Sequence, residues 1–437
     1  MQTNGHSPQS EPRVDIRRER KYRPTEAGTF HILTTLTAPD MPARDRQRPP
    51  LDLSFVVDRS GSMAGGALEL ARQGVEHALR LLDERDSVSV VVYDAEIDTL
   101  LTQHLCDSEA RAKATRRLRR VQPRGSTALA DGWLTGCNEL APLSDGSRVI
   151  RHDGGRPLCR ALLLTDGLAN VGMTDSGELS HHAAQLRQRG ITTTTFGVGH
   201  GYDEDLLANM ADSGGGHFHH IPHAVAIPQV FAGELGEMLQ IALRDVTIAL
   251  RVPTTWSLHL LNDLPIERDG DWIVLRIGEL FANDSQSHVW AVDLPPMGHG
   301  RHETFEVRLR WSDADGQDRF DQRLSHTVEA SHSPGHLDDR VSEALARQLA
   351  ARARTEAVRY NRSGDYASAQ TVLQDAMASM PRTASAAAEL HDLSMDVDSL
   401  TRQAAPATLK QQFSKARHAQ RSRKDYSQDT TPRSSMS

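Results

Sequence analysis

The stretch LDLSFVVDRSGSM, residues 51–63, decides the fold. Its first seven residues form a short apolar run, typical of a strand that is buried on both faces of a parallel sheet. The run ends at Asp58, and small polar residues follow, with glycines at 61, 65 and 66 that allow a tight turn. Residues 67–82, ALELARQGVEHALRLL, then carry apolar side chains at helical spacing. The stretch therefore predicts a buried strand, a polar turn and a helix.

The same alternation of strand and helix continues to about residue 240. Three further apolar stretches have the composition of buried strands: SVSVVVYD (87–94), CRALLLTDG (159–167) and ITTTTFGVG (191–199). Segments with helical periodicity separate them, among them residues 108–121 and 176–190. This order predicts an α/β fold, a doubly wound and mostly parallel sheet, for residues 50–240.

The pattern changes after residue 242. Residues 243–331 alternate apolar and polar side chains between turn residues, which predicts a β-sandwich-like domain. The β-prone segment 28–40 has no place in the parallel sheet, and we expect it to join this β-rich domain. Residues 336–401 are Ala-rich and predict a helical region built as a helical hairpin. The polar ends predict a disordered arm over 1–27 and a disordered basic tail over 402–437.

Composition excludes several classes of protein. Within 437 residues of net charge −8, no apolar run approaches the roughly 18–20 residues of a membrane span. The first residues have no apolar core of a secretory signal, and the three cysteines form no C-x-x-C pair. A cytoplasmic protein of a reducing compartment is therefore expected. The chain has five lysines, none after a glycine, so it has no phosphate-binding loop of a P-loop ATPase.

Three polar clusters follow predicted strands or enter a predicted helix. They contain Asp58, Ser60 and Ser62 in the first, Thr127 in the second and Asp166 in the third. In an open α/β sheet, ligands bind at the carboxyl ends of the strands, so these clusters are expected to meet. Three hydroxyls and two carboxylates are hard oxygen donors, which suit Mg²⁺. The sequence therefore predicts a metal site of Asp58, Ser60, Ser62, Thr127 and Asp166, with Mn²⁺ or Ca²⁺ as alternatives to Mg²⁺.

These motifs resemble those of the von Willebrand factor type A (VWA) domain. DRSGSM matches the D-x-S-x-S motif of its metal-ion-dependent adhesion site (MIDAS), GST (125–127) its threonine loop, and LLLTDGLANVG (162–172) its second aspartate loop. The resemblance spans residues 50–240 and includes the order of the three loops. It implies hydroxyl ligands at Ser60, Ser62 and Thr127, and it implies that Asp58 and Asp166 act directly or through water.

The resemblance also implies a function. In such domains a carboxylate of a protein partner completes the coordination of the metal, so a Mg²⁺-dependent interaction module without catalytic residues is expected, of a bacterial intracellular type. The partner would supply an Asp or Glu. The alternative is a non-catalytic subunit that works beside an AAA+ ATPase, in a MoxR- or chelatase-like chaperone assembly. No fold for base readout is expected, which argues against nucleic acid as the partner of the basic tail.

Weaker signals leave other interpretations open. Gly197, Gly199 and Gly201 form part of a dinucleotide loop but lack the full pattern. Five histidines between residues 200 and 223 indicate either a second metal site or a pH sensor, or only the two faces of one strand, which we favour. Ser60 and Ser62 lack the motif of a nucleophile. The basic run 111–124 is typical of a solvated helix face, with an anionic partner as the alternative.

Overall fold

The computed structural model describes residues 11–40, 48–141, 157–314, 316 and 318–421. Within these ranges the chain forms two compact units. One consists of residues 48–240, and the other of residues 11–40, 241–313 and 318–421. No helix of the described residues combines the length and the apolar composition that crossing a membrane requires.

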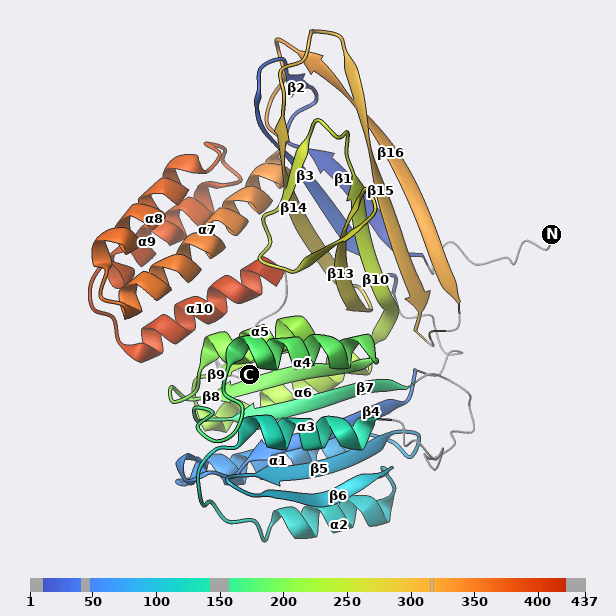
Figure 1. Ribbon diagram of the computed structural model, residues 1–437, viewed down its shortest axis with the longest axis vertical. Helices are drawn as coiled ribbons and strands as arrows, with labels where there is room; N and C mark the ends of the chain where they lie inside the picture. The colour runs from blue at the N-terminus through green and yellow to red at the C-terminus, as the bar shows by residue number, and fades with distance from the viewer. Residues whose placement is uncertain (1–10, 41–47, 142–156, 315, 317, 422–437) are drawn as a thin grey trace, which may run out of the picture. The chain divides into compact units, whose positions relative to one another are not determined.

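The unit of residues 48–240 is the predicted α/β domain (Figure 1). Its six-stranded sheet has the order β6-β5-β4-β7-β8-β9, and all neighbours are parallel except β5 and β6. The strands are β4 (Leu51–Asp58), β5 (Ser87–Tyr93), β6 (Ile97–Leu105), β7 (Leu158–Thr165), β8 (Ile191–Val198) and β9 (Gly215–Ile221). Connections that cross between strands place helices on both faces of such a sheet. They are α1 (Ala67–Leu81), α2 (Ser108–Leu118), α3 (Leu129–Leu140), α4 (Ser176–Gln188), α5 (Glu204–Gly214) and α6 (Ile227–Met238).

The two faces of the sheet follow from the alternation of side chains along each strand. On one face, Phe231 of α6 stacks on Phe55 of β4 and on Phe196 of β8, with ring centroids 6.3 and 4.4 Å apart. On the other face, α3 packs so closely on β4 that a Cβ at Gly136 would lie 2.2 Å from Val56 Cγ2. Because neighbouring strand residues point to opposite faces, β4 is buried along its whole length.

The β-rich unit is a sandwich of two antiparallel sheets, apart from one short parallel pair (β2–β16). Four strands have the order β1-β3-β14-β11, and six have the order β12-β13-β10-β15-β16-β2. Their bounds are β1 (Arg13–Arg18), β2 (Arg23–Pro24), β3 (Gly28–Thr37), β10 (Ile241–Arg251), β11 (Ser257–Leu260), β12 (Ile266–Asp269), β13 (Trp272–Phe281), β14 (Ser285–Leu294), β15 (His302–Asp313) and β16 (Arg319–Ser331). The segment expected to join this unit is β3, which pairs with β14 along its full length.

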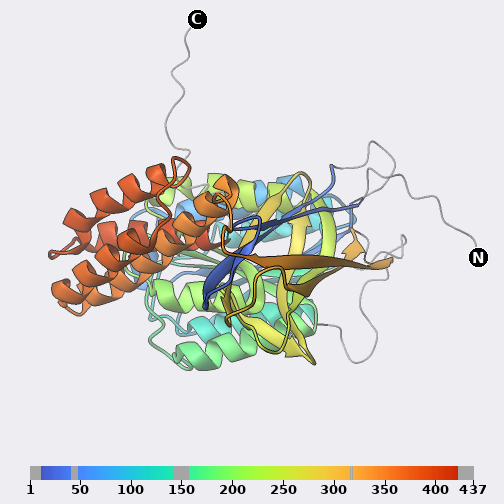
Figure 2. The ribbon, with the colours of Figure 1, turned by 90° about the horizontal axis from the view of Figure 1, so that it is seen from above.

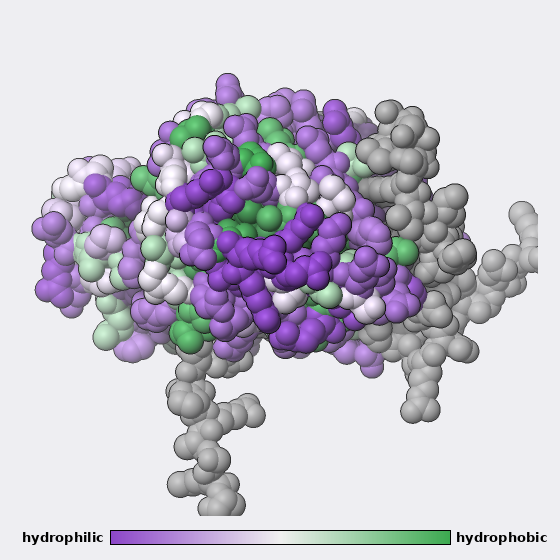
Figure 3. All heavy atoms as spheres, turned by 90° about the horizontal axis from the view of Figure 1, so that it is seen from below, coloured by the Kyte–Doolittle hydropathy of each residue, from purple (hydrophilic) through white to green (hydrophobic). Residues whose placement is uncertain are grey.

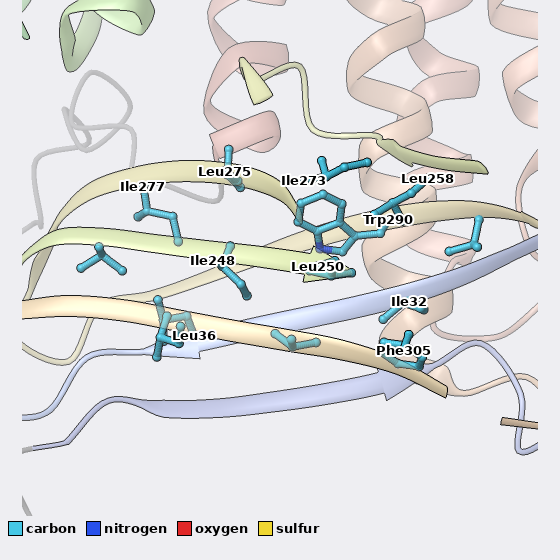
Figure 4. Packing of buried hydrophobic residues seen from close by; sticks show 14 of the residues in the cluster. Ile32, Leu36, Ile248, Leu250, Leu258, Ile273, Leu275, Ile277, Trp290 and Phe305 are labelled. Atoms are coloured by element: carbon cyan, nitrogen blue, oxygen red, sulfur yellow. The ribbon is translucent and has the colours of Figure 1, made fainter. Parts of the chain in front are cut away.

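The core of the sandwich lies between its two sheets (Figure 4). Ile32 and Leu36 of β3 and Trp290 of β14 face Ile248 and Leu250 of β10 across this core. On the outer face of the smaller sheet, other apolar residues of β3 and β14 pack on α7. The smaller sheet is thus covered on both faces.

In the part of the chain that the structure describes, four helices follow the sandwich, where a hairpin was expected (Figure 2). The hairpin corresponds to α7 (Asp339–Arg362) and α8 (Tyr366–Ser379), and α9 (Ala387–Leu400) and α10 (Pro406–Arg421) extend it. Both additional helices pack on α7.

The expected disorder of the two ends is wrong for most of their described residues. In the arm over 1–27, residues 13–18 form β1, which pairs with β3 because an edge strand offers unpaired backbone groups to any extended neighbour. In the tail over 402–437, Leu409, Phe413 and Ala416 are buried on one face of α10. Their spacing forms an apolar stripe that the polar composition conceals. Residues 1–10 and 422–437 lie outside the described residues.

Candidate metal centre

Asp58 is the innermost residue of the candidate centre. It is the last residue of β4 and is completely buried. Its Oδ1 accepts a hydrogen bond from the backbone N–H of Ser60 (2.7 Å), and its Oδ2 accepts one from the Thr165 hydroxyl (2.6 Å). The first bond shapes the turn after β4, and the second joins the ends of β4 and β7, which are neighbours in the sheet. The carboxylate is therefore fixed from two sides.

The three predicted clusters meet around this carboxylate. The Ser62 hydroxyl donates to Asp166 Oδ1 at 2.5 Å and lies 3.0 Å from the Ser60 hydroxyl. The Thr127 hydroxyl lies on the same side of Gly167 as the Ser62 hydroxyl. A Cβ built on Gly167 would lie 3.3 Å from Ser62 Oγ and 3.4 Å from Thr127 Oγ1. All five residues that the sequence singled out thus lie around one point at the carboxyl edge of the sheet. A side chain at Gly167 would crowd these hydroxyls.

Backbone contacts hold the threonine loop against the first turn. Gly61 N–H donates to the carbonyl of Gly125 at 3.2 Å, and Thr127 N–H donates to Asn170 Oδ1 at 2.8 Å. Gly125 has a φ of +71°, and a Cβ there would lie 3.3 Å from Asp94, so glycine suits this close approach. These contacts connect all three loops independently of the candidate ligands.

A charged layer lies behind the threonine loop. Asp94 is 2% exposed, and its Oδ2 forms ion pairs with Arg124 Nε at 2.7 Å and Arg59 Nε at 3.4 Å. Arg59 also reaches Asp98 at 2.7 Å. These ion pairs link the residue after Asp58 and the residue before Gly125 to the end of β5.

Electrostatics in the centre favour an added positive charge. Burial raises the pKa of Asp58 to about 6, and the negative charge of Asp166 contributes to the rise, although hydrogen bonds from Thr165 and Ser60 oppose it. Burial also raises the pKa of Asp166. Two carboxyl groups that are costly to ionise side by side are stabilised in the charged form when a cation lies between them.

Three residues that support the centre were not assigned a role from the sequence. Thr165 precedes Asp166, and its hydroxyl binds Asp58, while Asn170 caps the threonine loop and Asp94 anchors it. Thr165 is the last residue of β7, as Asp58 is of β4, and Asp94 directly follows β5. That shared position is a signal that could have identified them.

The weaker sequence signals have structural explanations in the described residues. A Cβ at Gly197 would lie 2.3 Å from the Tyr202 ring, and one at Gly201 would lie 2.7 Å from the Asp166 carbonyl, so close packing accounts for these glycines. In the basic run, Arg117 donates to the Leu100 carbonyl and Arg119 pairs with Glu76. Hydrophilic side chains dominate the face of the α/β domain that Figure 3 displays. These contacts favour the interpretation of residues 111–124 as a solvated helix face over that of a surface for an anionic partner.

Comparison with known proteins identifies the α/β domain. A family model described as the von Willebrand factor type A domain matches residues 52–232. The protein YfbK of Escherichia coli K12 is 29% identical over 282 residues, which cover 63% of this chain and 45% of that protein. The protein sll0103 of Synechocystis sp. is 26% identical over 369 residues, which cover 81% of this chain and 83% of that one.

A solved structure shares the fold over nearly the whole chain. The von Willebrand factor type A protein from Catenulispora acidiphila superposes with a TM-score of 0.70 and 18% identity, covering 95% of this chain and 98% of the other. At this identity the likeness concerns the fold alone. It extends beyond residues 52–232, so the β-rich unit and the C-terminal helices are part of the shared architecture.

Proposed function

Because residues 52–232 form a von Willebrand factor type A domain, a type of domain that typically mediates protein interactions, we propose that this chain is a Mg²⁺-dependent interaction module. Its ligands for the metal are Asp58, Ser60, Ser62, Thr127 and Asp166. The observation that carries the proposal is the convergence of these five side chains from three loops at one edge of the sheet.

The donor set fits the metal. Carboxylate and hydroxyl oxygens are the ligands of a hard divalent cation, and Mg²⁺ keeps several of its waters in such sites. Asp58 and Asp166 supply the negative charge, and Ser60, Ser62 and Thr127 supply neutral oxygens. When bound, the cation supplies an electrophilic position that an Asp or Glu carboxylate of a partner can occupy.

The centre is accessible at two of its five candidate ligands. Asp58, Ser60 and Thr127 are buried, whereas Ser62 is exposed and Asp166 is half-buried. Two residues after Asp166, the Leu168 side chain is 56% exposed. A partner that approaches the centre therefore meets an exposed apolar side chain beside the polar ligands, a combination that suits a protein surface.

We propose a binding role and no catalysis at this centre. The Ser60 and Ser62 hydroxyls lie 3.0 Å apart, and the Ser62 hydroxyl donates to Asp166 at 2.5 Å, contacts that suit metal ligands. A nucleophilic serine needs a base within hydrogen-bond reach and a third group that orients the base. The side chains around Ser62 are carboxylate and hydroxyl groups, which would hold a hard cation rather than act as a base.

Capture of a partner tests this function. The full chain is immobilised, and an extract of the organism that makes it is passed over it with Mg²⁺, with EDTA, and with EDTA followed by excess Mg²⁺. We expect one protein to bind in the first and third conditions and to elute with EDTA. A partner that binds equally in EDTA would contradict the proposal. The identity of the captured protein then separates a general scaffold from a subunit of an AAA+ ATPase assembly, since only the latter retains an ATPase.

Binding of Mg²⁺ is also expected to weaken at acidic pH. Asp58, with its pKa raised to about 6, must lose its proton before it can hold a cation. Affinity should therefore fall as the pH drops through 6, by about tenfold between pH 7 and pH 5. The stability of the metal-free fold depends on pH in the opposite direction. Because the pKa of Asp58 is higher in the folded than in the unfolded chain, its contribution to stability is fully present below the pKa of the unfolded chain and is lost as the pH rises through 6.

Isothermal titration of Mg²⁺ at pH 5, 6 and 7 and constant ionic strength measures this dependence. Thermal unfolding without metal at the same pH values provides the complementary measurement. An affinity that does not change between pH 5 and 7 would show that Asp58 is already ionised at the acidic end, contrary to the expectation.

A further inference from the structure

A second polar cluster is buried in the α/β domain, on the face of the sheet that α6 covers and opposite the face that α3 covers. His217 and His219 lie on one face of β9, and Glu234 lies on α6, which covers that face. His217 Nδ1 is 2.7 Å and His219 Nε2 is 2.9 Å from the same carboxylate oxygen, Glu234 Oε2. The three ligand atoms all lie within 4.8 Å of one another, and the three residues are between 1% and 6% exposed.

The surroundings orient this carboxylate. Arg160 of β7 and the Thr194 hydroxyl of β8 both donate to Glu234 Oε1, at 2.7 and 2.8 Å. That leaves Oε2 to the two imidazoles, so Glu234 offers a single oxygen to them. Although burial acts against ionisation, the charge of His217, the hydrogen bonds from His217 and His219, and Arg160 hold the pKa of Glu234 well below its usual range.

The imidazoles are held in place as well. The His219 ring stacks on Phe196 at 5.0 Å between centroids, and it meets the His217 ring edge to face at 6.0 Å. Glu237, one turn after Glu234 on α6, brings its Oε2 to 3.9 Å from His217 Nδ1 and is partly exposed. The cluster therefore has rigid walls and a carboxylate toward the surface.

We propose that His217 Nδ1, His219 Nε2 and Glu234 Oε2 form a binding site for a transition-metal ion of the Zn²⁺ class. Two imidazole nitrogens and one carboxylate oxygen are a common ligand set for Zn²⁺, with a fourth position for water or Glu237. The ion takes the place of the protons between the imidazoles and Oε2: the extra proton of a charged imidazole passes to solvent, and the proton of a neutral imidazole moves to its other ring nitrogen. Nitrogen donors also separate this site from the all-oxygen centre at Asp58, since imidazole favours zinc over magnesium.

A metal ion at this site would link α6, the last helix of the domain, to strand β9 of the sheet. β9 is the edge strand of the parallel sheet, and α6 is the last helix before β10 begins at Ile241. An ion that bridges β9 and α6 therefore closes the domain where the chain leaves it. Its role is structural, and it is independent of the function proposed for the centre at Asp58.

Zinc binding by the full chain tests the proposal. The protein is depleted of metal, Mg²⁺ is added in excess to occupy the oxygen-donor centre, and Zn²⁺ is titrated by calorimetry. The test variant combines His217→Asn and His219→Gln, whose amides can still donate to Glu234 but are poor zinc ligands. The matched control is His220→Asn, on the opposite face of the same strand, where the ring nitrogen bonds the Tyr202 hydroxyl.

We expect the wild type and His220→Asn to bind one Zn²⁺ that the double variant lacks, with at least a 100-fold difference in affinity. The thermal midpoint should rise with Zn²⁺ in the first two proteins only, and Asp58→Ala should keep this response. Equal zinc binding by wild type and double variant would overturn the proposal. If the double variant does not fold, Co²⁺ bound to the wild type decides: strong visible absorption of a four-coordinate site supports the proposal, and weak six-coordinate absorption overturns it.

Discussion

Replacing Asp58 by alanine is expected to abolish Mg²⁺ binding and the Mg²⁺-dependent capture of the partner. Asp58 is the most deeply buried of the five candidate ligands, and its carboxylate links the ends of β4 and β7. Loss of residues that only support a metal ligand costs about 10–100-fold in affinity, and loss of this carboxylate should exceed that range. A wild-type protein at 100 times its dissociation constant gains about 2.7 kcal/mol from the ligand, and the variant should gain none.

The same substitution should leave the metal-free domain folded. Removing the carboxylate leaves the Ser60 N–H without its acceptor, which costs about 1–3 kcal/mol, whereas the Thr165 hydroxyl keeps its 3.3 Å hydrogen bond to the Gly167 carbonyl. It also removes a buried charge whose raised pKa marks it as unfavourable without a cation. These effects oppose each other, so the metal-free midpoint should change little.

Thermal unfolding with and without Mg²⁺, together with calorimetry, measures both effects. Glu109→Gln is the matched control, because it removes one negative charge from an exposed position on α2. It should bind Mg²⁺ like the wild type. Retention of Mg²⁺-dependent partner binding by Asp58→Ala would contradict the assignment of this residue as a ligand.

Replacing Trp290 by alanine is expected to unfold the β-rich unit at a much lower temperature. The side chain is completely inaccessible, lies between the two sheets of the sandwich, and donates its indole N–H to the Thr34 hydroxyl at 3.1 Å (Figure 4). Truncation of a buried Trp costs about 3–5 kcal/mol, a large share of the 5–15 kcal/mol that stabilises a typical domain. Among the described residues, the core cluster that includes Trp290 contains none from the 48–240 unit.

Mg²⁺ binding should therefore survive in the Trp290→Ala protein while one unfolding transition moves down. Scanning calorimetry with and without Mg²⁺ separates the two units, since only the transition of the α/β domain should respond to the cation. Trp290→Phe is the control: it keeps an aromatic ring, loses the hydrogen bond to Thr34, and should shift the same transition much less. Joint loss of both transitions in Trp290→Ala would show that the units do not unfold separately.

The candidate centre was predictable from the sequence because its residues follow from local rules. An apolar run buried on both faces indicates a parallel strand, and the carboxyl ends of parallel strands share one edge of the sheet. Asp58 ends such a strand and Asp166 directly follows the neighbouring one, so their approach needs no knowledge of side-chain packing. The position of Thr165 at the end of a buried strand was a signal for a supporting role, but its hydrogen bond to Asp58 Oδ2 depends on which carboxylate oxygen faces the neighbouring strand.

The histidines show the opposite case. Their placement on two faces of one strand was predicted, and β9 has His217 and His219 on one face and His220 on the other. The sequence did not indicate a role for Glu234. It lies among apolar residues of a helix, where a single charged residue is expected to be exposed. Only the packing of α6 on the sheet brings its carboxylate between the two imidazoles and Arg160.

The sequence by itself determined the α/β domain, its boundaries near residues 50 and 240, and the five oxygen donors at one edge of its sheet. Tertiary structure decided what lies at a distance along the chain: β1 joins the sandwich, α10 packs on α7, and Glu234 meets the histidines. The physical reason is the range of the interactions. Strand ends and turns are fixed by neighbouring residues, whereas edge pairing, helix docking and buried ion pairs depend on surfaces that exist only after the chain has folded.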